Sequence, residues 1–350
     1  MASSDPDPVQ LPDPHQLPDV LKSMFTKNNF DSLESKLSSD KSLLEVFGKY
    51  VGRYVNADFH WGELEFFESA STTLKANTDA IKTLFATYVQ SLNTDGTILE
   101  DKSPFAAALR QNRTITQLII DDARAKLSPL ITNFPNVSYL ECSVNSFADL
   151  LNASPNVINQ LKELSLTGET KQTSKLLADP SLALPERVKI DIDDEEFAFF
   201  KENFSPTKQF IQNFSTPLAG KFPAVKRLNI SLRQKSVFFT DEVAELATFL
   251  KIFPNLEDAR ILVDVCAPLS GVNTEEFQTF QNTIKEFEFG VNLNFSLHNE
   301  FSAAAYDVGT IDSLKNAGFT QDRGTGGSFT CKWTAPGKSF IHEMENFQAR

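Results

Sequence analysis

An eleven-residue pattern that occurs three times after residue 132 constrains the fold most. Each copy begins with Phe-Pro, passes through a short turn and ends in a run of apolar residues spaced as in a β-strand. The copies occupy residues 134–144, 222–232 and 253–263. The second and third begin 31 positions apart, and the first two begin 88 positions apart, which is close to three such periods. The spacing predicts a repeated structural unit.

Weaker copies of the strand fill the intervals between these three. They lie at residues 161–166, 187–192 and 291–297. Between strands, residues 241–253 and 274–287 have the apolar spacing of helices, with Thr240 and Asn273 as N-caps. Alternation of this kind is typical of stacked repeats, because each unit exposes an apolar face that only its neighbours can cover. We predict an α/β fold in which an N-terminal helical region precedes repeats with a parallel sheet and outer helices.

Phenylalanine is unusually frequent, with 31 residues against 5 tyrosines and 2 tryptophans. This side chain has no polar group, so most of the rings are expected in a large core. In the Phe-Pro pair, proline cannot extend a helix and favours an extended conformation for the residue before it. The pair is therefore expected where a helix gives way to a strand.

The first third of the chain has a different pattern. Residues 1–16 contain four prolines and several aspartates and are predicted to be a disordered leader. Residues 17–132 carry apolar residues at three- and four-residue steps and are predicted to be a helical domain. Residues 133–350 form the predicted repeat domain. The predicted helix N-caps are Asp40, Asp79 and Ser103, the last of which precedes Pro104.

Alternation along the predicted strands sorts their residues onto two faces of the sheet. The apolar face is predicted to form core, and its residues are Leu140, Cys142, Val144, Val188, Ile190, Ile192, Leu228, Ile230, Leu232, Ile261, Val263, Leu293, Phe295 and Leu297. The other face is predicted to be open and to bind a partner protein, and its residues are Glu141, Ser143, Glu163, Ser165, Lys189, Asp191, Asn229, Ser231, Arg233, Arg260, Asp264, Asn292, Asn294 and Ser296. The alternative is a solvated face without a ligand.

The strands, each preceded by a helix and a Phe-Pro turn, resemble the degenerate leucine-rich repeats of F-box proteins over residues 134–300. The asparagine that follows the strand in regular repeats is mostly missing here. Residues 17–55, which open with Leu17-Pro18, resemble a degenerate F-box, a module that begins with Leu-Pro before a helix and places two short helices behind it. The family's late Cys-Lys-x-Trp-like element is absent, and Gly48-Lys-Tyr lies near that place.

This resemblance implies a substrate receptor of a cullin-type ubiquitin ligase. The F-box would bind the small ligase adaptor and the repeats would hold the substrate. The residues that the resemblance assigns to adaptor binding are Leu17, Pro18, Leu21 and Phe25. The phenylalanine content and divergent repeats also resemble the large F-box-related families of nematodes. The alternative is a repeat-type regulatory or scaffold protein with no ligase link, which pairs with a paralogue.

Composition disfavours several other classes. A chain with a formal net charge of −13 is repelled by the phosphates of nucleic acid and by acidic membrane surfaces. Three distant cysteines form neither a disulfide framework nor a Cys-x-x-Cys zinc motif. The N-terminus lacks the pattern of a signal peptide, and no apolar run approaches the roughly 18 residues of a membrane span. We therefore expect a cytoplasmic protein, with the nucleus as a second compartment.

Three segments contain residue types that elsewhere support chemistry. The acidic run 191–196 has ligands for a hard cation, but acids also complement the start of a helix. Residues 324–327 are glycine-rich but lead into an expected strand, which predicts a hairpin loop rather than a phosphate loop. Cys331 and His342 would act together only if the fold brings them close. We expect no enzyme, metal or cofactor, and a deep pocket of convergent polar groups would argue against this.

Overall fold

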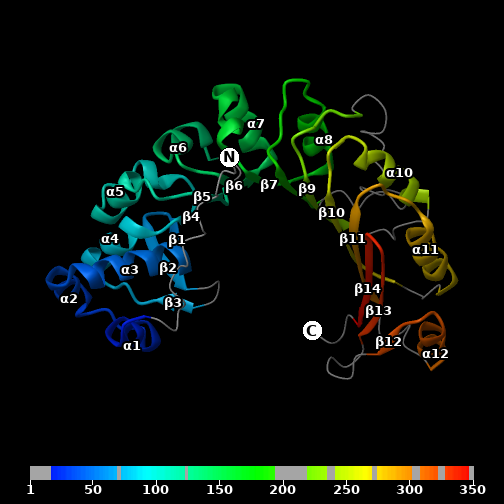
Figure 1. The fold of residues 1–350 in the computed structure, drawn as a ribbon, viewed down its shortest axis with the longest axis horizontal. Coiled ribbons are helices and arrows are strands. Elements are labelled where there is room, and N and C mark those ends of the chain that lie inside the picture. The colour runs from blue at the N-terminus through cyan, green and yellow to red at the C-terminus, as the bar shows by residue number, and fades with distance from the viewer. Residues whose placement is uncertain are drawn as a thin grey trace, which may run out of the picture. The chain divides into compact units, whose positions relative to one another are not determined.

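The computed structural model describes most of the chain, namely residues 17–68, 72–122, 125–193, 219–234, 241–269, 274–301, 308–321 and 328–346. Over these residues the protein is a mixed α/β structure with a large, mostly parallel sheet that is not closed into a barrel (Figure 1). Contacts divide it into unit 1 (Met1–Cys142 and Asp149–Gln160) and unit 2 (Ser143–Ala148 and Leu161–Arg350). The predicted leader lies outside the described residues.

Unit 1 combines helices with a six-stranded part of the sheet. Its helices are α1 (Asp19–Lys27), α2 (Leu33–Ser39), α3 (Lys41–Tyr54), α4 (Asp79–Tyr88), α5 (Pro104–Gln111) and α6 (Leu127–Asn133). Its strands are β1 (Val55–His60), β2 (Glu63–Glu68), β3 (Thr72–Leu74), β4 (Ser91–Thr94), β5 (Gln117–Ile120) and β6 (Tyr139–Ser143). Their order is β3-β2-β1-β4-β5-β6. The last four are parallel, and the first two form an antiparallel edge.

The prediction that residues 17–132 are wholly helical is wrong from Val55 onward, where five strands lie between the helices. In β1 the buried residues Val55, Ala57 and Phe59 alternate with more exposed polar ones. This period of two is a strand signal, but it follows directly on the helical spacing of α3. The strands β4 and β5 have four residues each. A run this short does not reveal its period.

Helix starts in unit 1 follow the capping rules closely. Asp40 accepts hydrogen bonds from two backbone N–H groups in the first turn of α3, and Ser103 accepts one in α5. Both were predicted from sequence. For α4 the cap is Thr78 rather than Asp79, because Thr78 Oγ1 accepts from the Ile81 N–H at 3.2 Å.

Phenylalanine rings form the centre of unit 1. The ring centroid of Phe85 on α4 lies 5.1 to 6.2 Å from those of Phe25, Phe30, Phe47 and Phe66. These residues come from α1, the turn after it, α3 and β2. The N-terminal helices are thus fixed onto the sheet by one aromatic cluster.

Unit 2 contains the longest parallel run of strands. Its strands are β7 (Glu163–Gly168), β8 (Arg187–Asp193), β9 (Arg227–Gln234), β10 (Asp258–Leu269), β11 (Asn292–Phe301), β12 (Thr320–Gln321), β13 (Phe329–Ala335) and β14 (Lys338–Asn346). Their order is β7-β8-β9-β10-β11-β14-β13-β12. Pairing is parallel from β7 to β14, and β13 and β12 add an antiparallel edge.

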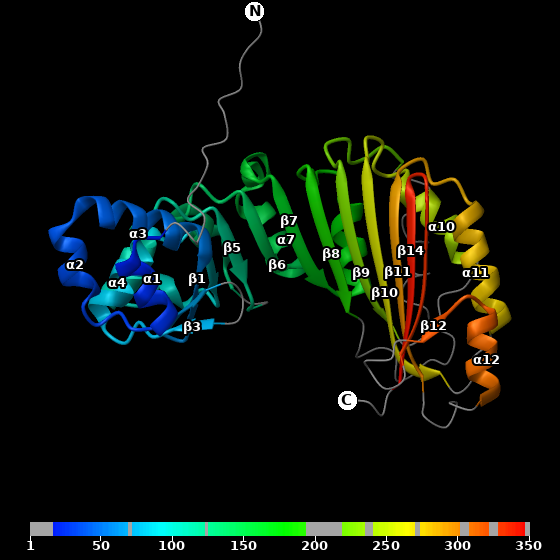
Figure 2. The same cartoon turned by 60° about the horizontal axis from the view of Figure 1, so that its bottom comes forward.

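Helices of unit 2 lie on one side of its strands (Figures 1 and 2). They are α8 (Thr170–Ala178), α10 (Asp241–Leu250), α11 (Thr274–Glu286) and α12 (Val308–Asn316). A further helix, α7 (Val144–Ala153), contains residues of both units. None of the helices in the described ranges combines the length and the apolar character needed to cross a membrane.

Every strand predicted after residue 132 is present. The six repeat strands are β6 to β11, and helices predicted at residues 241–253 and 274–287 are present as α10 and α11. The expected strand after the glycine-rich segment is β13, which pairs with β12 in antiparallel fashion. The predicted caps Thr240 and Asn273, and the loop 324–327 itself, lie outside the described residues.

The Phe-Pro pair forms the same turn in all three copies. Phe134, Phe222 and Phe253 are buried, and each carbonyl oxygen accepts a hydrogen bond from the N–H three residues later, at 3.1 to 3.4 Å. The rings of Phe222 and Phe253 stack with centroids 5.6 Å apart. In all three copies the turn therefore buries a ring and directs the chain into the next strand, and in the first and third it also follows the end of a helix, α6 or α10.

The third position of the turn connects it to an earlier part of the chain. Asn136 Nδ2 donates to the carbonyl oxygen of Arg113 at 2.7 Å, and Asn255 Nδ2 donates to that of Pro223 at 2.8 Å. In the second copy this position is Ala224, which has no side-chain donor.

The predicted apolar face is confirmed. All fourteen of its residues are buried, with at most 4% exposure. Val144 is buried as the first residue of α7 rather than as part of a strand.

Candidate binding face

The side of the unit 2 sheet opposite its helices carries polar residues from β7 to β11, and we call it the polar face. Eleven of the predicted partner-binding residues lie on it and are exposed or half-buried. They are Glu163, Lys189, Asp191, Asn229, Ser231, Arg233, Arg260, Asp264, Asn292, Asn294 and Ser296. The period of two in the strands therefore placed most of the predicted set correctly.

Three predicted residues do not offer a free side chain on this face. Ser165 is only 1% exposed, although its position in the strand register is opposite Lys189. Ser143 Oγ accepts a hydrogen bond from the Ser146 N–H at 3.1 Å at the start of α7. Glu141, which belongs to unit 1, accepts one from the hydroxyl of Tyr139.

Register places the polar residues of neighbouring strands in rows across the sheet. The first row contains Glu163, Arg187, Arg227, Asp258 and Asn292. The second row, two residues further along each strand, contains Ser165, Lys189, Asn229, Arg260 and Asn294. Neighbouring residues in one row are about 4.8 Å apart at the backbone, so their side chains can contact the same ligand.

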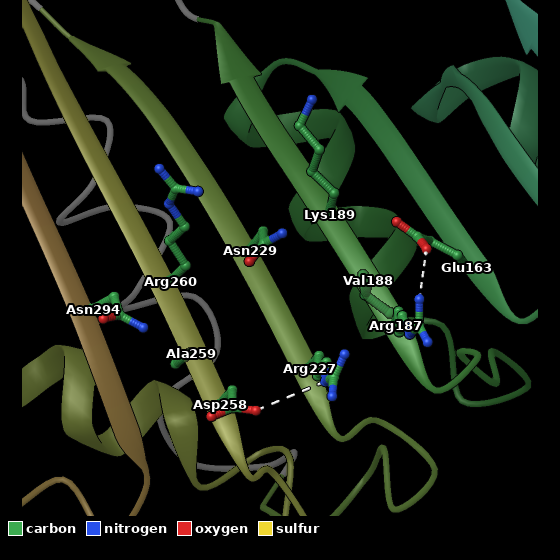
Figure 3. Close-up of a pocket in the computed structure, with 10 residues that line it drawn as sticks. All are labelled: Glu163, Arg187, Val188, Lys189, Arg227, Asn229, Asp258, Ala259, Arg260 and Asn294. Carbon is green, nitrogen blue, oxygen red and sulfur yellow. Dashed lines mark hydrogen bonds and ion pairs between the residues drawn. The ribbon is translucent and has the colours of Figure 1, made fainter. Parts of the chain in front are cut away.

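These two rows line a pocket of about 310 Å³ (Figure 3). Its lining residues are Glu163, Arg187, Val188, Lys189, Arg227, Asn229, Asp258, Ala259, Arg260 and Asn294. Four of them are cationic and two are carboxylates, which leaves two positive charges in excess. The pocket is therefore basic in a chain whose formal net charge is −13.

Ion pairs neutralise only part of this charge. Arg187 Nη1 lies 3.5 Å from Glu163 Oε2, and Arg227 Nε lies 3.7 Å from Asp258 Oδ2. Lys189 and Arg260 form no ion pair or side-chain hydrogen bond with another of the described residues. Sequence reasoning missed Arg187 and Arg227. They lie two residues before Lys189 and Asn229, so the same period of two would have placed them on the polar face.

A second charged group lies near the carboxyl ends of the same strands. Asp264 Oδ1 lies 2.8 Å from His298 Nδ1, and Asp264 Oδ2 lies 3.7 Å from Arg233 Nε. The three residues are register neighbours on β9, β10 and β11. Here the Asp264 carboxylate is shared between the guanidinium of Arg233 and the imidazole of His298.

A wider hollow of about 780 Å³ lies at the opposite strand ends, between the Phe289–Val291 segment and the β13–β14 turn. Its Lys338 Nζ donates to the carbonyl oxygens of Lys285 and Phe287 at 2.6 and 2.9 Å. This ammonium therefore closes the C-terminal end of α11, where a cation complements the helix dipole. In the polar-face pocket, by contrast, Lys189 and Arg260 make no such hydrogen bonds with the described residues.

The strand register brings Cys331 and His342 side by side on β13 and β14. The Cys331 Sγ lies 3.5 Å from Gln281 Oε1, and burial raises the pKa of this thiol. Burial also lowers the pKa of His342 to about 3, with a further contribution from His298. An activated nucleophile needs the opposite shifts, toward thiolate and imidazolium. Both side chains belong to the interior of unit 2.

Acidic residues gather on the unit 1 sheet as well. His60 Nε2 lies 2.6 Å from Asp58 Oδ1 and 3.7 Å from Asp121 Oδ2. Burial raises the pKa of Asp58, which His60 opposes and Asp121 reinforces. In the described ranges, no three His, Cys, Asp or Glu side chains are arranged to hold a metal. Of the run 191–196, Asp191 is half-buried on β8, and residues 194–196 lie outside those ranges.

The residues assigned to adaptor binding are mostly interior. Leu17, Leu21 and Phe25 are at most 7% exposed, and only Pro18, which precedes α1, is half-buried. Their burial in the core of unit 1 leaves little of these side chains to meet an adaptor. The outward side of α1 instead exposes Val20, at 42%.

The chain matches no protein-family model, and no curated protein shows significant similarity to it.

Proposed function

We propose that this chain is a leucine-rich-repeat-like interaction protein that holds a partner protein on the polar face of unit 2. The observation that carries the proposal is the basic pocket on the side of the unit 2 sheet opposite the helices that the structure describes. Recurring strands and helices, with the same Phe-Pro turn before three of the strands, support the repeat interpretation. Repeat proteins characteristically bind partners on such open sheet surfaces.

Charge favours a protein as the partner. A polyanion such as nucleic acid would meet a basic pocket but also a chain with a formal net charge of −13. A folded or extended protein can match both a local basic site and acidic surroundings. The exposed Leu262, at 37%, adds an apolar contact on the polar face beside Ser231 and Ser296, its register partners.

A finer version of the proposal is a substrate receptor of a cullin-type ubiquitin ligase. Three helices, α1 to α3, follow Leu17-Pro18, as the F-box resemblance implies. An adaptor would then have to contact the outward side of α1, around Val20, because Leu21 and Phe25 are buried. The alternative is a regulator without a ligase link that pairs with a paralogue.

The test is affinity capture from cell lysate with the full chain, followed by binding measurements with each purified prey. Asn229→Tyr places a bulky ring at an exposed strand position in the pocket, where tyrosine is compatible with β-structure. Lys332→Gln is the control, since Lys332 is exposed outside the pocket on β13. We expect a direct partner that Asn229→Tyr loses and Lys332→Gln retains. A set of partners unchanged by Asn229→Tyr would refute binding on the polar face.

The ligase version has its own variant. Val20→Asp adds a charge to the exposed side of α1, and Thr26→Asp does the same at an exposed position without an apolar side chain. If the chain is a receptor, the wild type and Thr26→Asp capture adaptor and cullin and Val20→Asp does not. Absence of both from the wild-type capture, with polar-face partners retained, favours the regulator.

A further inference from the structure

Two arginines occupy directly opposed positions in the first row of the pocket. Arg187 on β8 and Arg227 on β9 are register partners, so their backbones are about 4.8 Å apart. The side chains reach outward to carboxylates on opposite sides of the row, Arg187 to Glu163 and Arg227 to Asp258 (Figure 3). The first row is therefore balanced within the protein, although at exposed sites these pairs are weak.

The second row has the same number of cations and no carboxylate. Lys189 and Arg260 flank Asn229, which is the register partner of both. Two strand spacings, about 9.6 Å, separate their backbones. Side chains of this length can lean toward one group held above Asn229. An ammonium with three N–H donors, a guanidinium with five and an amide with two then face the same space.

We infer that the second row binds a phosphoryl group carried by the partner, as a phosphorylated serine, threonine or tyrosine in an extended segment. This inference rests on the proposed function, because it names the chemistry by which the polar face holds its protein. A phosphomonoester carries about −1.5 to −2 charges near neutral pH and three acceptor oxygens. These match two cations in excess and a set of donors. A carboxylate supplies one charge and two oxygens, so it leaves part of the row unmatched.

The surroundings of the row fit an extended segment better than a free ion. The pocket continues across β7 to β11 rather than closing around the second row. Leu262 lies two residues beyond Arg260 on the same strand, about 7 Å away along the same side of the sheet. An apolar side chain next to the phosphorylated residue would contact Leu262, while the phosphoryl group meets Lys189 and Arg260.

Fluorescence anisotropy with the full chain tests this directly. The probes are three labelled degenerate pentapeptide mixtures that differ only in the central residue, which is phosphoserine, serine or glutamate. We expect phosphoserine peptides to bind at least about tenfold more tightly than either of the others, as charge-assisted hydrogen bonds of this kind allow. Equal binding of the glutamate mixture would overturn the phosphoryl assignment.

Variants place the binding in the second row. Lys189→Gln and Arg260→Gln are each expected to weaken phosphoserine binding about tenfold, while Lys189→Arg keeps most of it. Lys332→Gln removes the same charge from an exposed position outside the pocket and is expected to leave binding unchanged. If Lys332→Gln weakens binding as much as Arg260→Gln does, the effect is one of general charge and the site is lost. Thermal unfolding of each variant checks that the fold is retained.

Phosphatase treatment of the lysate separates this inference from the proposed function. Partners that are lost after phosphatase treatment and are also lost with Asn229→Tyr support the proposed function and the phosphoryl inference. Partners that survive phosphatase but are lost with Asn229→Tyr uphold the proposed function and overturn the inference. Partners that survive both overturn the two together. A single-stranded oligonucleotide that binds more tightly than the phosphoserine peptides would assign the row to nucleic acid and also overturn the inference.

Discussion

His342 Nε2 lies 2.8 Å from Asn299 Oδ1 in the interior of unit 2, and both residues are fully buried. Because the amide oxygen accepts only, the imidazole nitrogen donates, which fixes the tautomer of the neutral ring. The ring stays neutral in the folded protein because burial lowers the pKa of His342 to about 3.

This histidine makes stability depend on pH in a defined direction. The unfolded ring has an ordinary pKa of about 6.5, so between that value and 3 the unfolded state binds the extra proton. The free energy of unfolding therefore falls as pH falls through this window, by about 2 kcal/mol at pH 5. Urea unfolding at pH 7.5 and pH 5.0 measures the loss. His342→Gln keeps the other titrating groups. In this variant we expect the part of the fall in unfolding free energy that comes from His342 to disappear. An identical pH dependence in both chains would contradict the assignment.

Phe85 is expected to be the most sensitive position in the core of unit 1. It contacts four other rings and is fully buried, so Phe85→Ala should lower the free energy of unfolding by about 3–5 kcal/mol. Trp61→Ala removes a larger ring from the same unit, but Trp61 is 87% exposed. We expect that change to stay within about 0.5 kcal/mol. Chemical denaturation of the two variants compares them, and similar losses would mean that the ring cluster is not the core.

Gly168 at the end of β7 has no room for a methyl group. A Cβ there would lie 2.8 Å from Cγ2 and 3.0 Å from Cβ of Val144. We expect Gly168→Ala to destabilise the protein by about 1–3 kcal/mol through overpacking. In a double-mutant cycle with Val144→Ala, the loss from Gly168→Ala should shrink because Cγ2 of Val144, the nearer of the two atoms, is gone. Strictly additive effects would show that this contact is not the cause.

The buried thiols are expected to be unreactive in the folded protein. Burial raises the pKa of both Cys142 and Cys331, and neither is more than 7% exposed. Thiolate is the reactive form, so alkylation at pH 8 should be slow at both sites and become fast on unfolding. Mass spectrometry of tryptic peptides after a timed iodoacetamide reaction reads each cysteine separately. Rapid alkylation of Cys331 in the native protein would reopen the possibility of a nucleophile.

Sequence periodicity was most informative where strands are long and one-sided. In β8 and β9 the alternation of Val188, Ile190 and Leu228 with Lys189 and Asn229 specified which residues are core and which face outward. The three Phe-Pro copies also marked where β6, β9 and β10 begin. This much of the fold depends on local spacing, which a single sequence contains.

The rest depended on contacts between distant segments. Ser165 has the alternation of an outward residue but is only 1% exposed, which the spacing within its own strand does not reveal. The assignment of Leu21 and Phe25 to an adaptor surface came from a resemblance, whereas both side chains are buried in unit 1, Phe25 against the ring of Phe85 on α4. The pocket, too, emerges only when Lys189, Asn229 and Arg260 become neighbours through pairing of three strands.

The turn shared by the Phe-Pro copies has a consequence for how such a chain can change. A duplicated segment would carry its own buried phenylalanine and, at the third position, its own asparagine that donates to an earlier carbonyl oxygen. The copy at Phe222 shows that the ring stays buried without this hydrogen bond, since Ala224 occupies the third position. The third position of the turn can therefore vary while the buried ring is kept, and the outward strand residues occupy other positions of the unit than either of these.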